Sequence, residues 1–329
     1  MSGSDLPAAV VAIDVGGTGI KGVLIDDAGH VRHQLERVTP VAAGPTAVID
    51  SIRLMARELA AAATGSPLVA AGLVVPGIVD RCNGVAKSSA NIGWRDVPLR
   101  DVVAAELGVP VALEHDVRAA GLAERVVGRA RGVSDCLVLV IGTGIAGAVI
   151  IDGDIRSGTS GIAGEIGHLP VYPDGDPCAC GLRGCLEAYA SAGAVRRRYL
   201  SSAEHSALSP TTVQHIASSI AVDPDARRAW QDAAQALGIA LAAYTMLLDP
   251  ALIVLSGGLA EAGPALRDPV RKALSSSLGW HRVPAVEVSP LAARAGRAGA
   301  AIIAWNAAGR PEVPLTGLAD GLGLATARR

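Results

Sequence analysis

Three cysteines and one histidine stand close together in the sequence, and all four carry side chains that bind metal ions. They are His168, Cys178, Cys180 and Cys185. Thiolate sulfur and imidazole nitrogen are the ligands that Zn²⁺ prefers, and four protein ligands leave no coordination position open for a substrate. The spacing therefore predicts a structural Zn²⁺ site rather than a catalytic one.

The cysteines have two alternative interpretations, as scattered core thiols or as disulfides. We interpret Cys82 and Cys136 as core thiols. Cys178 and Cys180 are too close along the chain to bridge each other comfortably, and nothing marks the chain as secreted. Metal binding is therefore favoured for the cluster.

Two glutamates bracket the cluster. Glu165 precedes the histidine and Glu187 follows the last cysteine. A structural metal ion at this place would hold the two carboxylates in a fixed relation to each other. That arrangement suits the recognition of hydroxyl groups on a polyol or a sugar.

A strand, a glycine-rich turn and a second strand occur twice in the sequence. Residues 8–13 are apolar and run into Asp14 and a Gly-Gly-Thr turn, after which residues 21–26 return. Residues 136–141 run into a Gly-Thr-Gly turn in the same way, and residues 148–151 return. Short apolar runs bounded by glycine turns are typical of buried strands. The recurrence predicts an internally duplicated fold with a cleft between its halves.

Both turns have the composition of a phosphate-binding site. Glycine lets backbone N–H groups converge on an anion, and the threonine hydroxyl adds a donor. The first turn follows Asp14, and a carboxylate beside a phosphate cradle is what a magnesium–nucleotide complex requires. Neither turn matches a Gly-x4-Gly-Lys-[Ser/Thr] loop or a Gly-x-Gly-x-x-Gly helix start, so a P-loop kinase and a Rossmann dehydrogenase are disfavoured.

Asp116 follows a strand predicted over residues 109–113 and precedes a helix predicted over residues 118–127. It is therefore expected at the carboxyl end of a strand, where α/β sheets bind ligands. An aspartate that accepts a hydroxyl proton is what phosphoryl transfer to an alcohol requires. The alternative is a helix N-cap, a position that aspartate favours. Position alone does not separate the two.

The composition restricts the fold and the partners. Of the 329 residues, 50% are hydrophobic but only 2% are aromatic, and phenylalanine is absent, so the core must consist of Ala, Val, Leu and Ile. The net charge of −2 supports no nucleic-acid partner. The amino terminus lacks the basic region of a signal peptide, and the apolar run 236–248 is too short to span a membrane. We therefore expect a cytoplasmic protein without a membrane partner.

The remaining periodic segments alternate between strands and helices. The sequence predicts helices over residues 46–63, 224–248 and 294–307, and strands over residues 68–75 and 251–255. Such alternation is typical of an α/β architecture, here with mixed sheets.

Together these motifs resemble those of the ROK family (repressor, open reading frame, kinase), which belongs to the superfamily of sugar kinases, Hsp70 and actin. The resemblance runs from Ala9 to Ala308, and the Cys-x-Cys-Gly-x-x-Gly-Cys-Leu-Glu motif with its upstream Glu-x-Gly-His is the most specific part. It implies a bilobal, ribonuclease-H-like α/β fold with two mixed-sheet lobes around a cleft. The expected small lobe comprises residues 1–116 and about 295–310, the large lobe comprises residues 117–294 with the zinc motif, and residues 311–329 form a tail.

The resemblance also implies ATP-dependent phosphorylation of a hexose hydroxyl, with Asp116 as the general base. The implied nucleotide-binding residues, with Asp14 holding the Mg²⁺ of Mg-ATP, are Asp14, Gly16, Gly17, Thr18, Thr143, Gly144, Gly257 and Gly258. The implied sugar-binding residues, besides Asp116, are Gly77, Asn91, His115, Glu165, His168 and Glu187. His168 would use one ring nitrogen for zinc and the other for the sugar.

Three residues depart from the pattern of the kinases in this family. His115 replaces the usual asparagine before the catalytic aspartate, a residue that often touches the sugar. Arg118 replaces a small or amide side chain, and Gly19 replaces a lysine or polar residue, although Lys21 is close by. The departures leave the reaction class intact and make the identity of the sugar the open question.

The resemblance leaves several functions to compare. Phosphorylation of glucose at O6 is favoured, and an N-acetylhexosamine or amino-sugar kinase (the GlcNAc or ManNAc type) is the alternative. Many ROK members are regulators with a DNA-binding domain before the sugar-binding part, but Asp14 stands too near the amino terminus to leave room for one. A non-catalytic sugar sensor and polyphosphate as donor are less favoured. The family pattern implies a homodimer or homotetramer.

Overall fold

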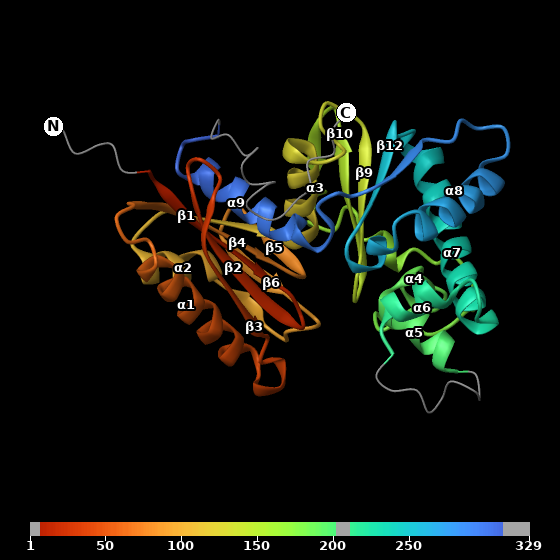
Figure 1. The fold of residues 1–329 in the computed structure, drawn as a ribbon, viewed down its shortest axis with the longest axis horizontal. Coiled ribbons are helices and arrows are strands. Elements are labelled where there is room, and N and C mark those ends of the chain that lie inside the picture. Colours follow the sequence, from red (N-terminus) through yellow and green to blue (C-terminus); the bar gives the residue numbers. More distant parts are fainter. Residues whose placement is uncertain (1–6, 202–210, 312–329) are drawn as a thin grey trace. The chain divides into compact units, whose positions relative to one another are not determined.

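The computed structural model describes residues 7–201 and 211–311, which divide into two compact units (Figure 1). The first unit contains the described residues up to Gly128, the segment Gly158–Ile162 and the described residues from Arg294. The second contains Arg129–Ser157 and the described part of Ala163–Ala293. The boundary falls after Gly128 rather than after Asp116, because helix α3 (Asp116–Val127) packs against α9 (Ala295–Ala307) in the first unit.

The first unit is built on a mixed five-stranded sheet in the order β3-β2-β1-β4-β8. Its strands are β1 (Ala9–Val15), β2 (Gly19–Asp26), β3 (Val31–Val38), β4 (Leu68–Val75) and β8 (Val111–His115). The pairs β1–β2 and β2–β3 are antiparallel, whereas β1–β4 and β4–β8 are parallel. The carboxyl ends of three parallel strands therefore lie at one edge of the sheet.

The second unit repeats this sheet, in the order β11-β10-β9-β12-β13. Its strands are β9 (Cys136–Ile141), β10 (Ile145–Ile151), β11 (Asp154–Arg156), β12 (Leu252–Ser256) and β13 (Ala285–Val288). The pairs β9–β10 and β10–β11 are antiparallel, and β9–β12 and β12–β13 are parallel. Strand order and direction thus match those of the first sheet, which confirms the predicted duplication.

Helices cover both faces of the first sheet (Figure 1). Helices α1 (Pro45–Ala61) and α2 (Leu99–Leu107) share a buried cluster with the sheet, and α9 packs on β1 and β4. Short elements complete the unit: β5 (Ile78–Asp80), β6 (Val85–Ser88) and β7 (Arg95–Val97) form a small sheet, and η1 (Val41–Ala43) precedes α1. As composition predicted, the buried core is mostly Ala, Val, Leu and Ile.

Helices of the second unit pack mainly around α7 (Pro224–Leu248), whose partners include α8 (Pro264–Leu278). Asp223 caps α7 by accepting hydrogen bonds from the backbone N–H groups of Asp225 and Ala226. The shorter helices are α4 (Glu187–Ala190), α5 (Ala192–Leu200), α6 (Val213–Ser219), η2 (Ile166–His168) and η3 (Gly258–Ala262), and η4 (Ala292–Arg294) joins the units. Among the described residues, no helix is long and apolar enough to cross a membrane.

The predicted elements match the structure except at their ends. Strand β8 lies two residues beyond the predicted 109–113, because its parallel pairing with β4 continues to the pair of Val75 and His115. Strand β10 begins at Ile145 rather than at residue 148, since its antiparallel pairing with β9 starts there. Strand β3 is largely exposed and carries no apolar run that predicts it. The predicted tail lies outside the described residues except for residue 311.

Helix α9 lies unusually close to the first sheet. A Cβ atom on Gly72 of β4 would be 1.9 Å from the carbonyl oxygen of Ala300 in α9. Any larger residue would therefore push the helix away from the strand. This close packing fixes the position of the first turn of α9 next to the carboxyl end of β1.

We predict that Gly72→Ala destabilises the protein by about 1–3 kcal/mol or more, because the added methyl group overlaps the backbone of α9. Thermal unfolding followed by circular dichroism measures the effect. The control is Gly193→Ala in α5, where the nearest atom to the new Cβ is the flexible end of Arg197 at 3.7 Å. Equal melting temperatures for the two variants would contradict the close approach.

Candidate active site

Asp116 lies at the junction between a strand and a helix. Strand β8 ends at His115, and α3 begins at Asp116. The N-cap position of α3 is occupied by His115, which makes no side-chain capping bond. The alternative prediction that Asp116 is the N-cap residue is therefore wrong. The side chain of Asp116 instead accepts a hydrogen bond from the backbone N–H of Val117 through Oδ1, at 2.8 Å.

The surroundings of Asp116 make it more basic than an ordinary aspartate. Burial raises its pKa to about 6, although the N–H of Val117 and the charge of Arg118 act in the opposite direction. The side chain is still 32% exposed, so a substrate hydroxyl can reach it. Asp116 is ionised at pH 7.5 and has a pKa suited to accepting a proton.

Asp14 lies near the end of β1 and forms an acidic pair with Asp116 in the first unit. The pKa of Asp14 is raised to about 7, mainly by burial and secondly by the negative charge of Asp116, while Arg297 and Lys21 lower it. Its Oδ2 is 2.4 Å from the place where a Cβ on Gly296 would be, so the carboxylate lies against the first turn of α9. Two repelling carboxylates are stabilised in their ionised form by a cation bound nearby.

The first Gly-Gly-Thr turn lies directly after Asp14. The N–H of Gly16 donates to the carbonyl of Gly19 at 2.8 Å, and the hydroxyl of Thr39 donates to the carbonyl of Gly16 at 2.6 Å. Thr18 is exposed at the turn. Asn91 lies beside Gly17, with its Cβ 3.6 Å from the position of a Cβ on that glycine.

Gly77 has a structural reason to be glycine. It has φ +94° in the connection between β4 and β5, and a Cβ there would be 2.1 Å from the carbonyl oxygen of Ser88. The position therefore requires glycine for the fold of the first unit, whether or not a sugar binds beside it.

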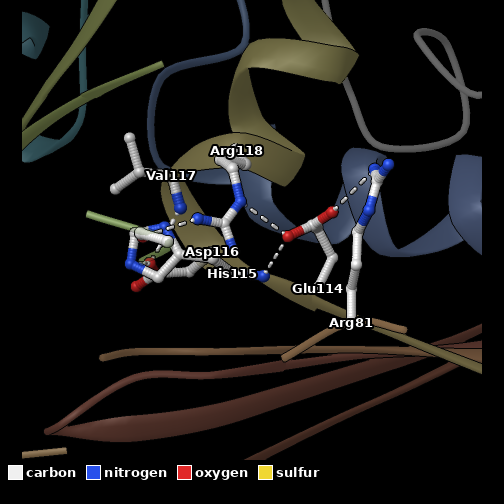
Figure 2. A network of polar contacts seen from close by, with 7 residues as sticks. Arg81, Glu114, His115, Asp116, Val117 and Arg118 are labelled. Atoms are coloured by element: carbon white, nitrogen blue, oxygen red, sulfur yellow. Dashed lines mark hydrogen bonds and ion pairs between the residues drawn. The ribbon is translucent and has the colours of Figure 1, made fainter. Parts of the chain in front are cut away.

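A polar network surrounds the junction that carries Asp116 (Figure 2). Oε1 of Glu114 accepts hydrogen bonds from the backbone N–H of His115 and from Nε of Arg118, both at 2.8 Å. Arg81 approaches the other oxygen of Glu114 at 3.7 Å. Arg118 is only 5% exposed and also donates to the carbonyl of Gly161 at 3.1 Å. The unusual arginine is thus engaged within the first unit.

The second glycine turn is held by Glu187. Oε2 of Glu187 accepts a hydrogen bond from the N–H of Ile145 at 2.8 Å and lies 2.8 Å from where a Cβ on Gly144 would be. The N–H of Ala192 donates to the carbonyl of Gly142 at 2.9 Å. Thr143 is exposed at the tip of the turn. The structure therefore brings a predicted sugar ligand against a predicted phosphate-binding turn.

The four predicted metal ligands lie together in the second unit. Their ligand atoms are all within 4.8 Å of one another. Sγ of Cys178 is 3.8 Å from Nδ1 of His168, and the Sγ atoms of Cys180 and Cys185 are 3.7 Å apart. Tetrahedral Zn²⁺ with Zn–S bonds of about 2.3 Å separates two thiolates by about 3.8 Å, so the donor set fits this ion. All five cysteines of the chain are free of disulfides. Cys136 is buried, as predicted for a core thiol, but Cys82 is exposed in the turn between β5 and β6, so that prediction is wrong for Cys82.

The other predicted sugar ligands of the second unit stand next to this cluster in the sequence. Glu165 is exposed and immediately precedes η2, which ends at His168. Because Nδ1 of His168 faces Cys178, Nε2 is the ring nitrogen left for another partner.

A cavity of about 260 Å³ adjoins Gly258 in the second unit. Its walls come from α6, α7 and η3 and include Gln214, Trp230, Leu259 and Glu261. Sequence reasoning predicted Gly257 and Gly258 but none of these wall residues. They come from separate segments, and no local motif marks them.

Nearly the whole chain is similar to known proteins. Residues 10–307 match the ROK family. The chain belongs to the ROK family. As a family member it is 32% identical to a glucokinase of Streptomyces coelicolor and 35% identical to a glucokinase of Thermotoga maritima, each over 89% of this chain and 96% of the relative.

A solved ROK structure shares the fold. The ROK family glucokinase of Streptomyces griseus, described in complex with glucose and AMPPNP, superposes with a TM-score of 0.80 at 30% identity. The alignment covers 91% of this chain and 100% of the other. The likeness confirms the predicted fold class, that of the actin, hexokinase and Hsp70 superfamily.

We predict that Asp116→Asn is more stable than the wild type at pH 8 and that the difference disappears towards pH 4. The folded-state pKa of about 6 is above the ordinary value of 3.8, so ionisation of Asp116 costs stability above pH 6 but not below pH 4. Melting temperatures of both proteins, measured from pH 4 to pH 8 in buffers without Mg²⁺, provide the check. A variant that is less stable at pH 8 would contradict it.

Proposed function

We propose that this protein transfers the γ-phosphoryl group of ATP to a hydroxyl group of a hexose, with O6 of glucose as the favoured acceptor. The observation that carries the proposal is Asp116, a partly exposed carboxylate with a pKa of about 6 at the carboxyl end of β8. The glucokinases among the relatives support the same reaction.

In the proposed reaction Asp116 acts as the general base. Its carboxylate takes the proton of the sugar hydroxyl as that oxygen forms a bond to the γ-phosphorus, and the bond from this phosphorus to the bridging oxygen of ADP breaks. Backbone N–H groups and hydroxyls of the two glycine turns hold the phosphate oxygens.

Mg²⁺ fits the acidic site of the first unit. Asp14 is a partly buried carboxylate whose charge is disfavoured by desolvation and by Asp116, and a divalent cation relieves that cost. When bound with ATP, Mg²⁺ supplies neutralisation of the charge on the β- and γ-phosphates. The role of Asp14 is to hold this ion, and the first turn of α9 adds a favourable dipole for phosphate.

The cavity beside Gly258 is proposed to bind the adenine ring of ATP. Trp230 and Leu259 offer apolar surface for a flat heterocycle, while Gln214 and Glu261 carry polar groups able to meet its ring nitrogens. The N–H of the Trp230 indole already donates to the carbonyl of Ala265 at 2.8 Å, so this side chain is fixed in place.

As the family resemblance implies, the proposed ligands of the sugar hydroxyls, besides Asp116, include Asn91, Glu165, His168 and Glu187. Zn²⁺ bound by His168 and the three cysteines would be structural, since all four positions of a tetrahedron are taken. It would fix the ring of His168 and the start of α4 at Glu187. The metal performs no chemistry on the sugar in this proposal.

The family resemblance also supports a homodimer or homotetramer in the cytoplasm. Met246, Leu247 and Trp280 of the second unit are exposed apolar side chains of the kind that contribute to such interfaces. Light scattering of the purified protein measures the oligomeric state directly.

The function is tested with a coupled assay of ADP release over glucose, mannose, allose, fructose, glucosamine, GlcNAc and ManNAc. We expect turnover with Mg-ATP to be highest with glucose, and a roughly 10²- to 10⁴-fold lower kcat for Asp116→Asn. Sugar binding by this variant, measured by calorimetry, should stay close to that of the wild type. Absence of turnover with every sugar would refute the kinase proposal, and highest activity with GlcNAc or ManNAc would favour the alternative substrate class.

The zinc site is tested by metal analysis of purified protein. We expect about one zinc per chain, and its loss in Cys180→Ser together with a lower melting temperature. Cys82→Ser is the matched control, because Cys82 is an exposed free thiol outside the cluster. A stable protein without metal would refute the assignment.

A further inference from the structure

His115 makes a direct contact with the proposed general base. Its Nε2 lies 3.2 Å from Oδ1 of Asp116, and its side chain is only 10% exposed. The same oxygen accepts the hydrogen bond from the N–H of Val117. Two groups with N–H bonds therefore meet one oxygen of the carboxylate, as the close view of the junction shows (Figure 2).

The position of His115 is itself fixed by its neighbours. It is the last residue of β8 and is paired with Val75 of β4. Its backbone N–H donates to Glu114 at 2.8 Å, and Glu114 is held in turn by Arg118 at 2.8 Å. The backbone of His115 is therefore held next to Asp116 by strand pairing and by its hydrogen bond to the Glu114–Arg118 ion pair.

We propose that His115 is a positioning residue for the general base: its Nε2–H holds Oδ1 of Asp116, so that Oδ2 is the oxygen that receives the proton of the sugar hydroxyl. This inference rests on the proposed kinase function. It gives His115 a role different from that of the sugar ligand implied by the family pattern. A side chain whose Nε2 is directed at Asp116 and which is nearly buried is poorly placed to bind a sugar hydroxyl through that nitrogen.

The contact has a chemical consequence for the base. A hydrogen bond donated to a carboxylate favours its ionised form, and two donors on one oxygen restrict rotation of the whole group. Of the other charged groups, Arg118 of α3 lowers the pKa of Asp116, and Asp116 in turn raises the pKa of Asp14 of β1. Glu114 faces Arg118 and Arg81 rather than the base.

Two substitutions separate positioning from sugar binding. His115→Phe removes the donor and keeps a ring, whereas His115→Asn keeps a donor that cannot titrate. We expect a roughly 10- to 100-fold lower kcat for His115→Phe, the effect of losing one hydrogen bond to a charged group, with little change in KM for the sugar. His115→Asn should stay within about threefold of the wild type. His33→Phe, at an exposed site on β3, is the matched control.

The pH profile gives a second readout that a merely structural role would not move. At saturating Mg-ATP, kcat/KM for the sugar should fall below about pH 6 in the wild type, because Asp116 becomes protonated. This acidic limb of the kcat/KM profile should move to higher pH in His115→Phe and should keep its wild-type position in His115→Asn. A raised KM in both variants, with kcat and the limb unchanged, would overturn the proposal in favour of a sugar ligand.

Two further measurements keep the inference testable. If His115→Phe does not fold, His115→Ala with added imidazole replaces it, and the expected result is partial recovery of kcat; a wild-type kcat and limb without imidazole would overturn the proposal. Carbon-13 NMR titration of the Asp116 carboxyl needs no turnover. The pKa of Asp116 should be higher in His115→Phe, or in His115→Ala, than in the wild type, even if no sugar is phosphorylated. An unchanged pKa of Asp116 would refute the contact independently of the kinase proposal.

Discussion

The first unit keeps two carboxylates partly buried near each other, at a cost in stability when they are ionised. Asp14 and Asp116 stand at the ends of β1 and β8, strands that are parallel to β4 between them. Burial raises the pKa of both groups, and the charge of Asp116 raises that of Asp14 further. The fold tolerates this cost because strand pairing and the packing of α9 hold the backbone in place. Both carboxylates are therefore more basic than ordinary aspartates.

The second unit has a sheet with the same strand order, but its glycine turn is held in a different way. Its glycine turn carries no carboxylate of its own, and Glu187 reaches it from the segment after the last cysteine. Glu187 comes two residues after Cys185, one of the four candidate metal ligands. The Glu187 carboxylate accepts a hydrogen bond from the N–H of Ile145, directly after the turn. The two sheets thus carry similar turns, and in the second unit the turn is held by a residue that follows the cysteine cluster in the sequence.

Much of the fold could be predicted because its signals are local. Apolar runs ending in glycine turns marked β1, β4 and β9, and helix α7 matched its predicted bounds. The metal ligands were predicted from spacing alone, and the structure brings them together. Strand β3 was missed because it is an exposed strand without an apolar run. The boundary between the units lies beyond the predicted one because the place of α3 depends on α9, which is far away in the sequence.

The sequence by itself determined the family, the order of the main strands and helices and the four members of the His/Cys cluster, because these follow from short motifs whose spacing is local. Only the tertiary structure decided which contacts are made by His115 and Arg118, the residues that depart from the family pattern. Arg118 is a buried partner of Glu114 and Gly161, and His115 is directed at Asp116. The cavity walls beside Gly258 were likewise assembled by folding. Such roles depend on distances between residues that the chain brings together by strand register and helix packing, and no sequence motif records them.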